Sequence, residues 1–213
     1  MKRRALITAL LVLGTCGAVA AIPPSGPHRR GEAAIAIRDV VPGYQQFFTQ
    51  RYTVPRLEAA YERAWYFTET PLHPQGDALF AALDEATRSC AHVDLFILAH
   101  GNRYIDVVRR LEPWQREKLR LVYDTGGGSA RQGREWLSLG VGAFIGHPGG
   151  NIAPAFYVDF LPQWTKHQDA EQALKHANDE VYDLMYGRVG SLANRWMDRD
   201  RLWEGTEAQL FRR

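Results

Sequence analysis

The feature that most constrains the fold is a regular alternation, between residues 64 and 147, of short apolar runs and segments with helical spacing. Apolar runs of strand length lie at 64–70, 93–99, 118–124 and 141–147. Helical spacing of apolar residues lies between them, at 77–90, 105–117 and 130–140. Strands that alternate with helices pair in parallel, and continuous apolar runs indicate strands covered on both faces. The sequence therefore predicts an α/β domain with a mainly parallel sheet.

Two further segments complete this domain. Residues 169–186 have one apolar stripe at helical spacing, with Asp169 and Gln172 placed as a capping box, and predict the clearest helix of the chain. The tail at 194–213 alternates charged residues with large apolar ones and favours a final helix on the surface. The whole arrangement predicts a single domain over residues 41–213.

The first residues have the pattern of an export signal. Lys2, Arg3 and Arg4 precede an uncharged apolar run that ends in small residues. The letters LGTC, which end at Cys16, resemble a bacterial lipoprotein box, although Thr15 is unusual in it. Residues 1–22 are therefore a cleaved signal peptide, a lipoprotein signal with a lipid on Cys16, or an uncleaved anchor. Each alternative predicts a bacterial protein that is periplasmic or held at the membrane by its N-terminus.

Residues 23–40 begin rich in proline, glycine and charge and predict a linker.

Composition excludes several classes of function. The net charge is +2, with no dense basic face, so a nucleic-acid partner is not expected. Beyond residue 22 only Cys90 remains, so we expect no internal disulfide. No cofactor motif is present, and the glycines at 126–128 match neither the phosphate-loop nor the dinucleotide pattern.

Polar residues follow three of the predicted strands at the point where each strand ends. In parallel sheets these carboxyl ends lie at one edge, where functional groups gather. The candidates for a relic catalytic site are His100, Tyr123 and Asp124. The candidates for a binding role are Gly101, Thr125, Gly126, His147 and Asn151. A residue in such a position can also simply satisfy loop backbone groups.

The ordered series of these segments resembles a known family. DLFILAHG supplies a strand followed by His-Gly, LVYDTGGG supplies a second strand followed by x-Thr-Gly, and WLSLGVGAFIG supplies a helix, a glycine and a third strand. Over residues 60–186 the chain resembles the caspase-like cysteine peptidases of clan CD, and most closely the CHAT domains. The resemblance implies a three-layer sandwich with helices on both faces of the sheet. It also implies that His100 faces the residue at position 123.

The chain departs from this family at the nucleophile, because Tyr123 stands where the family has cysteine. A phenol has an unperturbed pKa near 10 and is a poor nucleophile toward amides. We therefore expect a degenerate peptidase site, with the Tyr123 ring buried and its hydroxyl bonded to a neighbour such as His100. The expected function is binding or scaffolding with an unknown protein or peptide partner. The alternative is a hydrolase that uses His100 with Asp124, and His147 besides, without a thiol.

Other groups could in principle replace the missing thiol or recruit a metal. Cys90 lies at the opposite end of its strand from His100, more than roughly 20 Å away at about 3.3 Å per residue. Ser129 lacks the glycine pattern of a hydrolase elbow and is predicted to be the N-cap of the next helix. His100, Asp124 and His147 are zinc-type ligands, but no short ligand spacing joins them, so no metal site is predicted.

Overall fold

A computed structural model of the chain describes residues 29–39, 47, 49–98, 104–149, 156–166, 169–183, 186, 203–204 and 206–213. The strands in this part are β1 (Arg29–Arg38), β2 (Tyr61–Thr68), β3 (His92–Leu98), β4 (Leu119–Gly127), β5 (Ala143–His147) and β6 (Gln209–Arg212). They form one sheet in the order β2-β1-β3-β4-β5-β6. All neighbours are parallel except β6, which is antiparallel to β5. The predicted parallel neighbours β3, β4 and β5 are confirmed.

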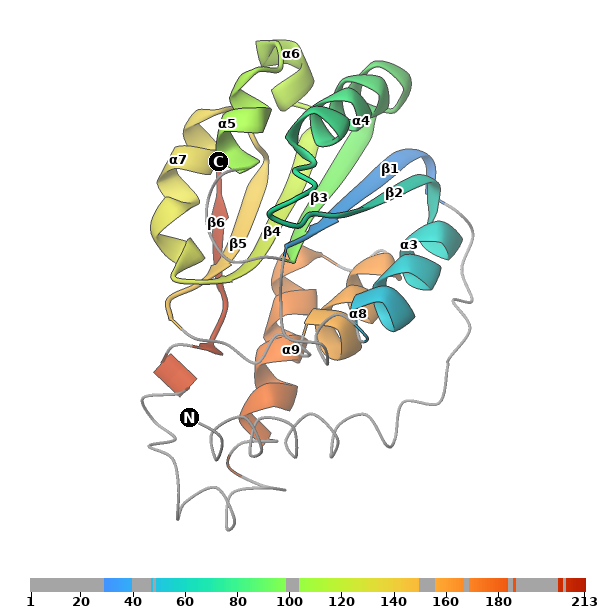
Figure 1. Cartoon of the computed structure of the whole chain (residues 1–213). Coiled ribbons are helices and arrows are strands. Elements are labelled where there is room, and N and C mark those ends of the chain that lie inside the picture. Colours follow the sequence, from blue (N-terminus) through green and yellow to red (C-terminus); the bar gives the residue numbers. More distant parts are fainter. Residues whose placement is uncertain are drawn as a thin grey trace.

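Helices cover both faces of this sheet (Figure 1). On one face lie α3 (Val54–Ala60), α8 (Leu161–Thr165) and α9 (Ala170–Asp183), with the π-helical turns η1 (Thr49–Thr53) and η3 (Phe156–Phe160). On the other lie α4 (Gly76–Ser89), α5 (Tyr104–Arg109), α6 (Pro113–Arg116), η2 (Ser129–Gln132) and α7 (Gly133–Ser138). The molecule is a three-layer α/β sandwich, as predicted. Within the described ranges, none of the helices has the length and apolarity that a membrane span requires.

The two cores are built from alternate residues of the same strands. Successive side chains of a strand point to opposite faces, so a strand buried on both sides must be apolar throughout. In β3, Phe96 and Leu98 pack beneath α3, α8 and α9, whereas Leu95 and Ile97 pack beneath α4 and α5. This explains why the apolar runs of the sequence are continuous rather than alternating.

The linker prediction for residues 23–40 is wrong for residues 29–38, which form β1. This strand lies inside the sheet and pairs in parallel with both β2 and β3. Residues 33–37 are fully buried. The glycine and the charges at 29–32 mask a short apolar run, AAIAI, that is itself of strand length.

Two helix predictions need correction. The helix predicted over 105–117 is divided into α5 and α6, because Pro113 keeps Glu112 in an extended conformation with ψ of 152°. The Glu112 N–H instead donates to the Gln115 side chain at 3.0 Å, and this bond caps the N-terminus of α6. In the tail, Gln209–Arg212 is the strand β6 rather than part of a final helix.

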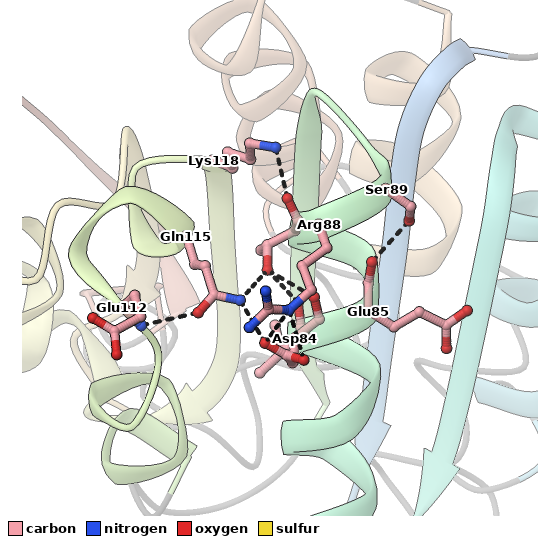
Figure 2. Close-up of polar contacts among 9 residues, drawn as sticks. Asp84, Glu85, Arg88, Ser89, Glu112, Gln115 and Lys118 are labelled. Carbon is pink, nitrogen blue, oxygen red and sulfur yellow. Dashed lines mark hydrogen bonds and ion pairs between the residues drawn. The ribbon is translucent and has the colours of Figure 1, made fainter.

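A polar junction joins α4 to α6, and Figure 2 shows its side chains. Arg88 and Gln115 both donate to the Asp84 carboxylate, at 2.9 Å and 2.7 Å. Lys118 donates to the carbonyls of Thr87 and Cys90, at 2.6 Å and 3.0 Å, near the C-terminal end of α4, where a cation is favourable. These groups satisfy one another, so the junction is structural.

A second polar network lies at the amino ends of the strands. Asp94 on β3 is fully buried and accepts hydrogen bonds from Tyr61, Trp164 and both Nε and Nη2 of Arg120. Arg120 also pairs with Glu32 on β1 at 2.8 Å. Although burial acts to lower it, the charge and hydrogen bonds of Asp94 raise the pKa of Arg120. The network ties four strands and α8 together.

Candidate functional site

Two of the predicted site residues, Tyr123 and His147, meet at the carboxyl edge of the sheet. The Tyr123 hydroxyl lies 3.1 Å from Nε2 of His147. The two rings are stacked, with centroids 5.8 Å apart. They come together because β4 and β5 are parallel neighbours whose register places Tyr123 opposite Ile145, two residues before His147.

The Tyr123 ring is buried, as predicted, and two phenylalanines hold it. The edge-to-face contacts to Phe156 and Phe160 have centroid distances of 4.9 Å and 4.8 Å. The two phenylalanines are four residues apart in FYVDF, a spacing that places them on one face of the helical turn η3. Tyr123 is 1% exposed. Its ring therefore fills the space at this strand end.

His147 is fixed by hydrogen bonds at both ring nitrogens. Its Nδ1 lies 2.7 Å from the Thr206 carbonyl, which can only accept, so we assign the proton to Nδ1. Nε2 is then the acceptor for the Tyr123 hydroxyl. Burial lowers the pKa of His147 to about 4, although the bond to Thr206 acts to raise it. The imidazole is therefore neutral near pH 7, and neither nitrogen is free to move a proton for a substrate.

Asp124, the residue after Tyr123 on β4, is a buried carboxyl at the same edge of the sheet. One of its oxygens accepts the Gly126 N–H at 2.7 Å, which closes a short turn after the strand. Burial raises the pKa of Asp124 to about 7, although that hydrogen bond acts to lower it. Among the described residues, no lysine or arginine forms an ion pair with it. Burial therefore favours the protonated form of Asp124 well above the usual pH range of a carboxyl.

Ser129 links the ends of β4 and β5. Its hydroxyl donates to the Asp124 carbonyl at 2.9 Å and accepts the His147 N–H at 3.0 Å. The prediction that Ser129 is a helix N-cap is wrong, because it is the first residue of η2 and Gly128, with φ of +82°, occupies the cap. A serine, which both donates and accepts, suits the space between two strand ends.

The other predicted site residues divide into two groups. The Thr125 hydroxyl donates to the Ile97 carbonyl at 3.3 Å and so joins β4 to β3. Gly126 provides the N–H for Asp124. The remaining predictions, at Cys16, His100, Gly101 and Asn151, lie outside the described residues.

The described residues contain no cluster of three or more His, Cys, Asp or Glu side chains suited to a metal ion. Cys90 is buried at the C-terminal end of α4, with Sγ 3.7 Å from the Ser89 hydroxyl. It lies next to the start of β3, at the amino edge of the sheet.

A second group of polar residues at the carboxyl edge was missed. The connection from β1 passes through α3 on one face, whereas that from β3 passes through α5 on the other, so these neighbouring strands form a topological switch point. Arg38 ends β1 there, and the buried Asp39 follows it. Glu69, which follows β2, is also buried, and its N–H donates to the Arg38 carbonyl at 2.7 Å. Charged residues at strand ends are a usable sequence signal, but the linker prediction concealed the end of β1.

Comparison with known proteins assigns no family to this chain. It matches no protein-family model, and a search of the curated proteins finds no match.

Proposed function

We propose that this chain is an exported binding or scaffolding protein of the bacterial envelope, built on a caspase-like fold of the CHAT type whose peptidase site is degenerate. The partner is a protein or peptide that docks at the carboxyl edge of the sheet. The basic N-terminus and its apolar run support export, by a signal peptide, a lipid on Cys16 or an anchor.

One observation carries the proposal: the buried hydrogen bond between Tyr123 and His147. The residue at the family's nucleophile position is a phenol, and its hydroxyl and ring are committed to the protein itself. His147 has both ring nitrogens in hydrogen bonds and a pKa of about 4. A histidine that acts as a general base needs a free ring nitrogen within reach of the substrate and a pKa near the working pH. These two residues provide neither, which favours a structural role at an edge used for binding.

A second candidate function rests on Asp124. A carboxyl with a pKa of about 7 can act as a general acid or base near neutral pH. Acting together with His100, Asp124 would activate water for hydrolysis of an ester or amide without a thiol. The buried position of Asp124 and its bond to Gly126 speak against this, because a catalytic carboxyl must reach the substrate.

The two functions are separated by an activity assay on the purified protein. Fluorogenic peptide and ester substrates are incubated between pH 4 and 9 with wild type, Asp124→Asn and His100→Ala, and folding is checked by circular dichroism. We expect no turnover by wild type above that of the variants. Hydrolysis by wild type that Asp124→Asn or His100→Ala abolishes without unfolding would establish the hydrolase and overturn the binding proposal.

A further inference from the structure

The loop between β2 and α4 contains a turn that hydrogen bonds hold in place. Thr70 and His73 exchange both backbone hydrogen bonds, at 3.2 Å and 3.0 Å, and the Thr70 hydroxyl also accepts the His73 N–H at 3.1 Å. Before the turn, the Glu69 N–H is bonded to the Arg38 carbonyl. After it, the Gln75 N–H donates to the buried Glu69 carboxylate at 3.2 Å. The turn at residues 70–73 is thus fixed at both ends.

The tip of this turn is apolar and points into solvent. Leu72 is 85% exposed, the highest value among the exposed large hydrophobic residues of the described part of the chain. Pro71 and Pro74, on either side, are exposed as well, and their rings restrict the backbone. Single exposed leucines are ordinary on protein surfaces. A leucine held out on a turn that hydrogen bonds and two prolines fix is different, because much of the backbone entropy that binding would cost is already lost.

The turn also lies where the proposed function needs a contact surface. Through Glu69 and Arg38 it adjoins the carboxyl end of β1, on the side of β1 away from β3. We propose that the 70–73 turn is a docking element whose Leu72 side chain enters an apolar pocket on a partner protein. This inference rests on the proposed binding function and names the residue that anchors the partner.

A protein pocket fits this tip better than a lipid surface. Residues 69–75 contain no lysine or arginine to attract anionic headgroups, and the nearby Arg110 is paired with Asp77 at 3.1 Å. One leucine with two prolines is also far less apolar surface than an interfacial anchor uses. In a protein pocket, by contrast, the full burial of one leucine changes affinity by roughly ten- to one-hundred-fold.

Photo-crosslinking in the native host, on the full chain, tests the inference. Leu72→p-benzoylphenylalanine provides the probe, and Tyr182→p-benzoylphenylalanine, at an exposed position on α9, is the matched control. We expect one protein adduct of discrete mass from position 72 and none from position 182. Added wild-type protein should suppress this adduct, and Leu72→Met should compete almost as well. Leu72→Asp should compete at least about ten-fold more weakly, and Pro71→Gly severalfold more weakly because it loosens the turn.

Three results would overturn the inference: no adduct from position 72, equal adducts from both positions, or equal competition by Leu72→Asp and wild type. Co-sedimentation with phosphatidylethanolamine–phosphatidylglycerol vesicles that Leu72→Asp abolishes would also overturn it, in favour of a lipid surface. Failure here is distinguishable from failure of the proposed function. Hydrolysis that depends on Asp124 refutes that function, whereas a missing adduct removes only the role of Leu72.

Discussion

At the scale of single residues, Asp124 and His147 are two buried titratable groups whose effects on stability oppose each other. The pKa of Asp124 is about 7 in the folded protein and about 3.9 in an unfolded chain. Its contribution is therefore present below about pH 4 and is lost as the pH rises to 7. The pKa of His147 is about 4 when folded and about 6.5 when unfolded, so its contribution is lost as the pH falls from 6.5 to 4. The fold thus favours both groups in their neutral forms.

Asp124→Asn isolates one of these two effects. Asparagine keeps an oxygen that can accept the Gly126 N–H, but it cannot ionise. The free energy of unfolding of the variant, minus that of wild type, should rise with pH between about 4 and 7, by up to about 1.4 kcal/mol per pH unit. Urea titrations at acidic, intermediate and alkaline pH measure it. A difference that does not change with pH would contradict a buried carboxyl without a compensating cation.

At the scale of elements, the sheet is fastened at both ends by polar side chains that bridge strands. Ser129 joins β4 to β5 at the carboxyl edge, and Asp94 with Arg120 joins β3 to β4 at the amino edge. The two bridges differ in what their loss leaves behind. Loss of the neutral serine leaves an unbonded N–H and carbonyl, whereas loss of Arg120 leaves a fully buried carboxylate without its charge partner.

Arg120→Ala should therefore be strongly destabilising. We expect a loss of about 3–5 kcal/mol in the free energy of unfolding, the range found when one member of a buried ion pair is removed. Arg212→Ala is the matched control, because Arg212 pairs with Asp169 and Glu171 at the exposed surface and should cost about 1 kcal/mol or less. Urea unfolding of both variants measures this. Equal losses would show that the Asp94 network does not depend on Arg120.

The backbones of η2 and β5 approach each other closely, which predicts that an added side chain at their contact is destabilising. A methyl group at Gly146 would lie 2.7 Å and 2.9 Å from the backbone N and Cα of Ala130. Gly146→Ala should push η2 away, disturb the bond from His147 N–H to Ser129, and cost about 1–3 kcal/mol. Gly76→Ala is the control, because the nearest atom to its added methyl, on Val107, is 3.9 Å away. If thermal unfolding of Gly146→Ala and Gly76→Ala is the same, the contact is less tight than described.

These elements also show where sequence reasoning succeeds and where it fails. The strands β3, β4 and β5 were predictable because burial on both faces leaves continuous apolar runs. The division between α5 and α6 was missed because the periodic pattern continues through Pro113, although proline rules alone could have found it. The partner of Tyr123 was not fixed by the sequence. The strand order and the register decide which side chain meets Tyr123. The alternation of side chains along a strand determines neither of them.

At the scale of the whole molecule, the main difference from the sequence-based prediction is β1, which was assigned to a linker. This assignment also hid part of the carboxyl edge of the sheet. Without β1, the switch point between β1 and β3 could not be located, so Arg38, Asp39 and Glu69 were not considered. Alanine is not a strong strand former, and the run AAIAI is short. Its tertiary position explains the composition, because small side chains let helices pack closely on an interior strand.

The position of β1 gives the last prediction. A chain that begins at residue 41, the boundary predicted from the sequence, lacks the strand that pairs with both β2 and β3 and loses the buried residues 33–37. We expect no cooperative urea transition for residues 41–213 and a normal one for residues 23–213. A synthetic peptide of residues 23–40 should restore cooperative unfolding when added to the shorter chain, whereas the same peptide with Ile35→Asp should not, because residue 35 is fully buried beneath α4. Cooperative unfolding of residues 41–213 alone, with an unchanged midpoint, would show that β1 is dispensable and that the sequence-based boundary was right.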